Sequence, residues 1–143
     1  MDDYDFDRAC VLRPIGFVER DESDEELRGR ELRAHPARIV LDPRVRDALL
    51  GLEAGSDILV LCFFNRSDRD VLQVHPMGEN ENPLRGVFAT RSPARPNPIA
   101  VTSARVERIE ENVLHVIGLD ALDDTPVVDI KSLAETFHTP FDA

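Results

Sequence analysis

The chain has 143 residues, which is the length of one domain, and we expect residues 1–143 to form a single domain. Hydrophobic residues make up 42% and charged residues 31%, a globular composition that excludes disorder. No apolar run approaches the about 18 residues of a spanning helix, and the acidic start is no signal peptide. Cys10 and Cys62 lack the spacing of a disulfide framework. These features predict a cytoplasmic protein without membrane contact.

The charge balance is acidic, with 28 acids against 17 bases and a net charge of −11. The negative electrostatic field of such a protein repels polyanions, which argues against non-specific nucleic-acid binding. The bases are unevenly spread, however, and five arginines crowd into one quarter of the chain. They are Arg85, Arg91, Arg95, Arg105 and Arg108. A local cationic site on an acidic body therefore stays open.

Short apolar runs bounded by turn residues dominate the chain and predict strands. The run at 11–18 contains Pro14 and Gly16 and predicts an edge or bulged strand, and the continuous run at 57–65 predicts a fully buried one. Asp42 and Pro43 predict one short helix after a strand. Many short strands with one small helix favour a β-barrel. Strands are expected at 11–18, 37–41, 57–65, 71–74, 87–90, 99–109, 113–119 and 127–130.

The segment 86–98, GVFATRSPARPNP, is the most unusual in the chain because three prolines lie within six residues. Proline fixes the backbone, so Arg91, Arg95 and Asn97 are expected on a stiff ribbon. A stiff ribbon with polar groups suits a small polar ligand, since little entropy is lost on binding. Arg91 could pair with a carboxylate or phosphate. The alternative is a rigid crossover whose arginines are solvated or paired locally.

Other candidate residues are fewer. Asp120 directly follows a strand and could accept hydrogen bonds from a ligand amine or hydroxyl, whereas Asp123 and Asp124 are read as turn formers. Asp129 and Lys131 form either a surface ion pair or part of a site. The histidines and cysteines lack metal-ligand spacing, so no metal is expected, and Cys62 is assigned to the core. The glycines form neither a dinucleotide fingerprint nor a P-loop.

The run GVFATRSPARPNPIA resembles the signature of the TsaA-like family, which includes the TrmO tRNA methyltransferases. The likeness extends to RPIGFVER, GLEAGSDILVLCFFN and GLDALDDTPVVDIK, and covers a core of about 11–131, with tails at 1–10 and 132–143. The resemblance implies a mainly β protein, a small β-barrel that binds S-adenosylmethionine and forms a homodimer. It also implies a short form without the C-terminal domain of the longer members.

By the same resemblance, the expected activity is an S-adenosylmethionine-dependent methyltransferase acting on threonylcarbamoyl-modified adenosine of tRNA. The alternatives are a small-molecule acceptor or a non-catalytic S-adenosylmethionine-binding protein. Asp129 is the candidate for orienting or deprotonating the acceptor. Many members carry histidine where this chain has Asn65, which leaves the acid–base step open. The expected cofactor-binding residues are Asn65, Arg66, Arg91, Val101, Leu119, Asp120 and Arg28, with Arg30 as the alternative to Arg28.

Overall fold

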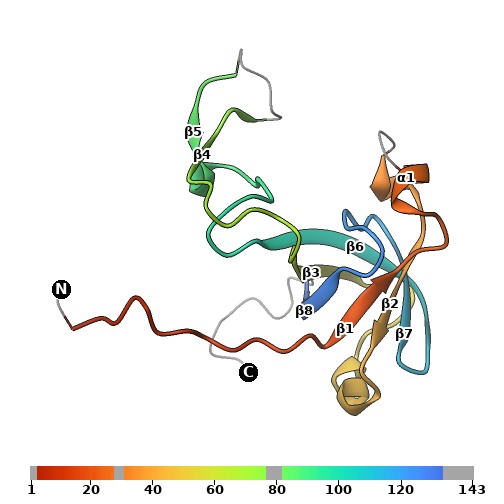
Figure 1. Ribbon diagram of the computed structural model, residues 1–143. Coiled ribbons are helices and arrows are strands. Elements are labelled where there is room, and N and C mark those ends of the chain that lie inside the picture. Colours follow the sequence, from red (N-terminus) through yellow and green to blue (C-terminus); the bar gives the residue numbers. More distant parts are fainter. Residues whose placement is uncertain (1–2, 28–30, 77–81, 134–143) are drawn as a thin grey trace.

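A computed structural model of the protein describes residues 3–27, 31–76 and 82–133. Its centre is a closed antiparallel barrel in the strand order β1-β2-β7-β6-β3-β8, with β8 returning to β1 (Figure 1). This arrangement confirms the expected mainly β barrel. The barrel strands are β1 (Gly16–Glu19), β2 (Ala37–Leu41), β3 (Asp57–Phe63), β6 (Ile99–Glu110), β7 (Val113–Ile117) and β8 (Pro126–Ser132).

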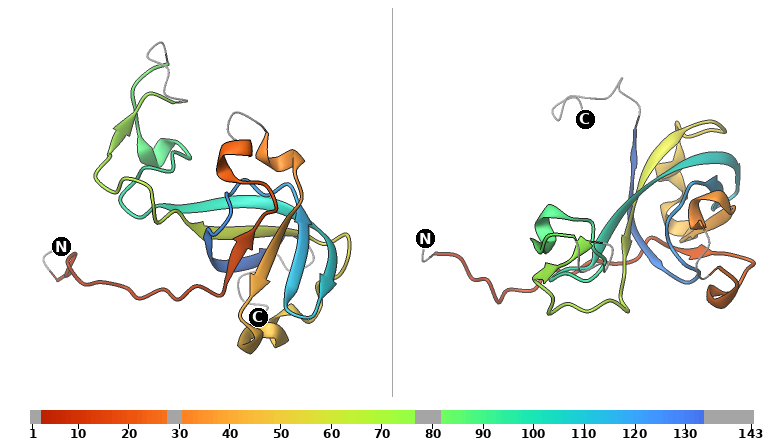
Figure 2. Two further views of the ribbon diagram at one scale, coloured as in Figure 1. Left: turned by 45° about the vertical axis from the view of Figure 1, so that its right-hand side comes forward. Right: turned by 90° about the horizontal axis from the view of Figure 1, so that it is seen from above.

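The remaining described elements are short and lie outside the barrel. Strands β4 (Gln73–Val74) and β5 (Arg85–Gly86) pair with each other and project from the barrel in both views of Figure 2. We call the described residues 68–76 and 82–98 the arm. Within the described parts of the chain, no helix has the length and apolar character needed to cross a bilayer. The helices are α1 (Asp24–Leu27) and the 3-10 turns η1 (Leu32–Ala34), η2 (Pro43–Leu49) and η4 (Val87–Ala89).

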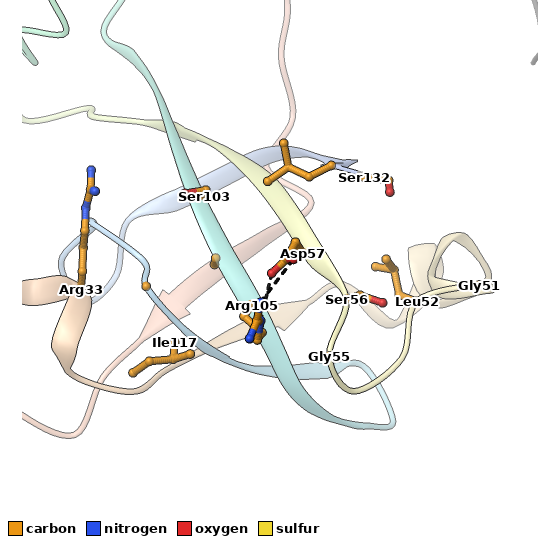
Figure 3. A pocket seen from close by; sticks show the side chains of 13 residues that line it. Arg33, Gly51, Leu52, Gly55, Ser56, Asp57, Ser103, Arg105, Ile117 and Ser132 are labelled. Atoms are coloured by element: carbon orange, nitrogen blue, oxygen red, sulfur yellow. Dashed lines mark hydrogen bonds and ion pairs between the residues drawn. The ribbon is translucent and has the colours of Figure 1, made fainter. Parts of the chain in front are cut away.

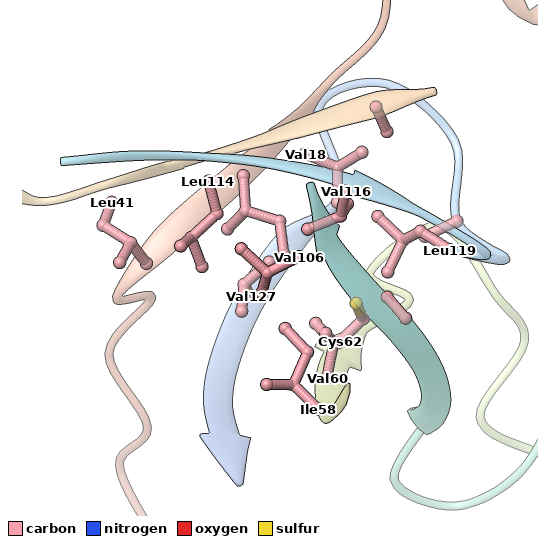
Figure 4. Close-up of a cluster of buried hydrophobic side chains, with 14 residues drawn as sticks. Val18, Leu41, Ile58, Val60, Cys62, Val106, Leu114, Val116, Leu119 and Val127 are labelled. Atoms are coloured by element: carbon pink, nitrogen blue, oxygen red, sulfur yellow. The ribbon is translucent and has the colours of Figure 1, made fainter. Parts of the chain in front are cut away.

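The core fills the barrel interior with side chains from alternate strand positions (Figure 4). In β3, Ile58, Val60 and Cys62 are fully buried, whereas Asp57 is exposed. The expectation of a strand buried on both faces is therefore wrong. A barrel strand has only one face toward the core, and the outward apolar residues of β3 are half-buried by neighbouring segments.

Leu114 in β7 is fully buried in this core, and truncating it tests the packing. We expect Leu114→Ala to lower the free energy of unfolding by about 2–5 kcal/mol, because it leaves a cavity. Leu50 is the matched control, since its side chain is 96% exposed and Leu50→Ala removes the same atoms without a cavity. Urea unfolding of both variants measures the difference. Equal effects at the two positions would contradict the core assignment.

Three expected elements differ in detail. The run at 11–18 becomes a strand only at Gly16, and β1 is no edge because it pairs with both β2 and β8. Gly16 is required there, since a Cβ would lie 2.6 Å from the carbonyl oxygen of Val40. The run at 87–90 is not a strand, because η4 forms there with Thr90 N–H bonded to the Val87 carbonyl. The helix after Asp42 is a 3-10 turn.

Candidate functional site

Two adjoining hollows lie where the proline-rich ribbon meets the loop that follows β7. Their volumes are about 400 and 460 Å³, and they share Phe64, Arg91, Pro93 and Asp120 as lining residues. We call the two hollows together the cleft. Its walls combine apolar surface with a guanidinium and a carboxylate, so it suits a ligand that carries both charge signs and an apolar part.

The ribbon that carries Arg91 is held in place by two other arginines. The Arg95 guanidinium donates to the carbonyls of Val87 at 3.0 Å, Ser92 at 3.1 Å and Thr90 at 3.2 Å. Arg69 donates to the Pro96 carbonyl at 2.8 Å and to Asn97 Oδ1 at 2.7 Å. The fixed backbone thus depends on hydrogen bonds as well as on proline. Arg95 and Asn97 are structural, which agrees with the crossover reading for these two residues.

Arg91 differs from these arginines. Its side chain is exposed, lines both hollows of the cleft, and makes no hydrogen bond or ion pair with the described residues. A guanidinium carries five donors in one plane and binds a carboxylate or phosphate through two of them. Because the ribbon holds its backbone while its donors stay available, Arg91 is prepared for an anionic group of a ligand.

Asp120 supplies the opposite charge. Its backbone N–H donates to Thr102 Oγ1 at 3.0 Å, which fixes the loop against β6. Its carboxylate is half-exposed and lies 3.8 Å from the Arg33 guanidinium, a weak contact that leaves acceptor positions for a ligand. Asp124 also lines the first hollow, although its position in a turn made it look purely structural. The cleft therefore offers carboxylates on the wall opposite the ribbon.

The loop that bears Asp120 is organised by Arg20, which is 6% exposed. Arg20 Nε donates to the Ala121 carbonyl at 2.7 Å and Nη2 to the Leu119 carbonyl at 2.7 Å. Its Nη1 donates to the His35 carbonyl at 3.1 Å. Its backbone N–H donates to Asp123 Oδ1 at 2.8 Å, so Asp123 is a structural residue as expected. One buried side chain thus fixes both flanks of Asp120.

Only some of the predicted binding residues lie together in the structure. Asn65, Arg66, Arg91, Val101 and Asp120 all line the cleft, and Arg66 also pairs with an acid of α1 at 3.3 Å. They come from three separate segments: the turn after β3, the ribbon with the start of β6, and the loop after β7. The fold therefore gathers residues that the sequence separates by more than 50 positions.

The other predicted residues lie elsewhere. The Leu119 side chain is fully buried in the core, so only its backbone belongs to the loop beside the cleft. Asp129 lines a different hollow, beneath η2, and its carboxylate pairs with Lys131 Nζ at 3.0 Å. Within one chain, Asp129 is thus a partner of Lys131 and not a group of the cleft. Arg28 and its alternative Arg30 lie outside the described residues.

Besides Asp124, sequence reasoning missed Arg20, Arg33 and Thr102 in this region. For Arg20 a signal existed, because Gly16 and Val18 face the core and the period of a strand places Arg20 on the same side. Arg33 and Thr102 carried no such signal. Arg33 lies in a charged stretch, and the role of Thr102 depends on a contact with a loop 18 residues away.

The two cysteines occupy opposite environments. Burial raises the pKa of the Cys62 thiol to about 12, whereas Cys10 is exposed. We expect a thiol reagent at pH 8 to modify one cysteine in the native protein and two in urea, because thiolate is the reactive form. Cys10→Ser should abolish the native reaction, and rapid labelling of Cys62 would contradict its burial.

Among residues 3–27, 31–76 and 82–133, no three potential ligands gather to hold a metal ion.

Comparison with known proteins gives concordant matches. Residues 23–139 match the family model described as the tRNA-methyltransferase O N-terminal domain. A probable S-adenosyl-L-methionine-binding protein of Methanocaldococcus jannaschii is 39% identical over 133 residues, covering 90% of this chain and 96% of its own. A mouse tRNA (adenine(37)-N6)-methyltransferase is 35% identical over 94 residues, which cover 65% of this chain and 22% of the mouse protein.

The likeness extends to solved structures. The crystal structure of TrmO from Pseudomonas aeruginosa superimposes with a TM-score of 0.68 at 30% sequence identity and covers 95% of this chain. The chain spans 61% of the length of that TrmO chain. The barrel, the ribbon and the sequence similarity agree, and the chain belongs to the tRNA-methyltransferase O N-terminal domain family.

Proposed function

We propose that the protein is an S-adenosylmethionine-dependent methyltransferase whose acceptor is tRNA, at the threonylcarbamoyl-modified adenosine. The observation that carries the proposal is the cleft, which is lined both by a guanidinium that has no partner among the described residues and by a half-exposed carboxylate. The relatives support both parts, since one is named for binding S-adenosylmethionine and another for methylating tRNA adenine. The expected single domain fits a match that extends over residues 23–139.

The residues of the cleft fit this cofactor chemically. S-adenosylmethionine carries a carboxylate, an ammonium group, ribose hydroxyls and an apolar base. Arg91 would hold the carboxylate through a bidentate pair. Asp120 would accept hydrogen bonds from the ammonium group or the ribose. Phe64 and Pro93 supply apolar surface to both hollows, and Val101 of β6 adds to it in the second.

When bound, the cofactor would supply a methyl group on a sulfonium for transfer to the acceptor. Such a transfer depends mainly on positioning, so rigid walls matter more than a strong base. The ribbon and the Arg20 loop provide that rigidity, through four guanidinium-to-backbone hydrogen bonds from Arg69 and Arg95 and three from Arg20. Asp120 and Asp124 are the carboxylates that could also receive a proton released from the acceptor.

We also propose that the protein forms a homodimer and works in the cytoplasm. The arm exposes Leu72, Leu84 and Phe88, with 65%, 54% and 84% of their surface accessible. A hairpin that projects from a barrel buries too little apolar surface to hold such side chains alone. A second copy that covers the arm would bury them next to the ribbon, since Phe88 lies in η4 only three residues before Arg91.

The test has two stages. Calorimetric titration with S-adenosylmethionine and S-adenosylhomocysteine should show binding of both. Transfer of radiolabelled methyl groups to tRNA that carries threonylcarbamoyladenosine should then exceed transfer to tRNA that lacks it. Binding without transfer to any tRNA would refute the methyltransferase proposal, and absence of binding would refute the cofactor assignment. Sedimentation velocity gives the oligomeric state separately.

A non-catalytic S-adenosylmethionine-binding protein is the second candidate. It is favoured by the position of Asp129, which lies in another hollow and so leaves the expected acceptor-orienting residue outside the cleft. The name of the Methanocaldococcus jannaschii relative also refers to binding alone. This candidate predicts cofactor binding with no labelled product from tRNA, which the second stage of the test measures.

A further inference from the structure

A separate hollow, larger than either part of the cleft, lies on the outside of the barrel beside β6. Its volume is about 820 Å³, and it is lined by Arg33, Leu52, Asp57, Ser103, Arg105 and Ile117 among others (Figure 3). We call it the groove. Arg33 lines both the groove and the cleft, so the two hollows meet at this side chain.

The origin of the groove lies in the path of β7. Strand β6 pairs with β7 only from Arg105 onward, where Arg105 is opposite Ile117. At Gly118 the chain turns away with a φ of +101°, a conformation that favours glycine. The part of β6 before Arg105 therefore has no paired residue in β7. The segment that contains Arg33 lies beside the end of β7 instead, where the Gly118 N–H donates to the Arg33 carbonyl at 3.1 Å.

The groove carries positive charge on an acidic protein. Among the described residues, its lining includes the guanidinium groups of Arg33 and Arg105 and one carboxylate, that of Asp57, while Arg33 also lies 3.8 Å from Asp120 of the cleft. Asp57 engages Arg105 through Nε at 3.0 Å and Nη2 at 3.5 Å (Figure 3). This pair orients the guanidinium plane, while Nη1 makes no hydrogen bond with the described residues. An arginine held in this way can still donate to a phosphate oxygen.

The path from the cleft to Arg105 is also long enough for more than one nucleotide. Val101, Ser103 and Arg105 lie on the same outward face of β6, and Val101 belongs to the cleft. From Val101 to Arg105 four residue steps of extended strand span about 13 Å, roughly four times the 3.4 Å rise per nucleotide of a stacked strand. Ser103 adds a hydroxyl between the cleft and Arg105. The outward face of β6 therefore leads from the cleft, past a hydroxyl, to the charged group of Arg105.

From these observations we infer that the groove binds the sugar–phosphate backbone of a single-stranded RNA segment, with Arg105 and Arg33 contacting phosphates on the way to the cleft. The inference rests on the proposed function, because it assigns a path to the acceptor. A base inside a duplex is shielded from reaction, so an acceptor base must come from an unpaired stretch or leave the stack. An arginine-lined groove that opens into the cleft suits such a stretch.

The strand offers a matched pair of variants. Arg105 and Arg108 both lie on β6, are 62% and 64% exposed, and each pairs with one acid, at 3.0 and 2.8 Å. Arg105→Glu and Arg108→Glu thus make the same change in net charge and each break one surface ion pair. Only Arg105 lines the groove, since Arg108 lines a separate hollow beside His115. Equal urea midpoints would confirm that both variants fold.

The measurement is fluorescence anisotropy with a labelled RNA stem-loop that has an unpaired loop, at several salt concentrations. We expect Arg105→Glu to weaken binding about tenfold and to reduce the salt slope by about one, since a charge-assisted phosphate contact is lost. Arg108→Glu should bind like the wild type. Neither variant should change the calorimetric affinity for S-adenosylmethionine, because neither residue lines the cleft.

The outcomes separate the two proposals. Unchanged RNA binding by Arg105→Glu, or equal losses in both variants, would overturn the groove assignment even if the wild type methylates tRNA. A wild type that binds S-adenosylmethionine but no RNA would overturn the groove assignment and the tRNA acceptor together. A wild type that binds RNA through Arg105 but no S-adenosylmethionine would support the groove and refute the proposed activity.

Discussion

Arg91→Ala is expected to weaken S-adenosylmethionine binding by about 10- to 100-fold while the protein stays folded. A hydrogen-bonded contact to a charged group contributes about 1.5–3 kcal/mol, and each 1.4 kcal/mol is a factor of ten. The folded state should be unaffected because Arg91 is exposed and makes no hydrogen bond or ion pair with the described residues. Calorimetric titration measures the affinity, and urea unfolding measures the stability.

Two further variants sharpen this experiment. Arg85→Ala removes an exposed arginine from the same arm at a position that does not line the cleft, and it should bind like the wild type. Arg91→Lys keeps the charge but loses the planar pair of donors, so its affinity should fall between the other two. If Arg91→Ala and Arg85→Ala bind equally well, the cleft does not hold the carboxylate through Arg91.

Arg20→Ala should produce the largest loss of stability among single arginine variants of the described chain. It removes three hydrogen bonds from a buried guanidinium and leaves the carbonyls of Leu119, Ala121 and His35 without that donor. At about 1–3 kcal/mol for each buried unsatisfied group, the free energy of unfolding should fall by at least about 3 kcal/mol. Burial lowers the pKa of Arg20, which reflects the same desolvation.

The control for Arg20 is Arg44, whose side chain is 89% exposed and pairs with Asp42 at the start of η2. An exposed ion pair contributes between zero and about 1 kcal/mol, so Arg44→Ala should be nearly neutral. Arg20→Lys tests geometry in addition, because one ammonium cannot reach three separate carbonyls. We expect Arg20→Lys to unfold at lower urea than the wild type and to bind the cofactor more weakly, since Asp120 loses its support. Wild-type cofactor affinity in a folded Arg20→Lys protein would exclude this positioning role.

The strands could be predicted because a barrel strand produces a short apolar run or an apolar–polar alternation in the sequence. The run ARIVL matches β2 residue for residue, and the alternation at 99–109 matches β6 to within one residue at its end. The secondary-structure prediction failed where tertiary contacts override the local sequence pattern. The run at 87–90 looks like a strand, yet Arg95 donates to its carbonyls and stabilises a 3-10 turn. No pattern inside 87–90 could have shown this.

The site was predictable only through chemistry that a single segment carries. Arg91 could be singled out because its proline-rich surroundings are unusual, and Asp120 because it directly follows a strand. The meeting of these two residues with Arg66 depends on how β3, β6 and β7 associate in the barrel. Asp129 shows the reverse case. Its charge suggested a role, but β8 carries it to the hollow beneath η2.

The closure of the barrel also constrains how the protein folds during synthesis. Gly16 pairs with Val127, so the last seam joins residues 111 positions apart in the chain. Strand β3 likewise waits for β8, since Leu61 pairs with Asp129. A nascent chain cannot complete either ladder before these late residues leave the ribosome. Such distant pairings also slow folding, in the range of milliseconds to seconds for β-rich domains. Until then β1 and β3 each expose an unpaired edge, and this interval is when the chain is most open to aggregation.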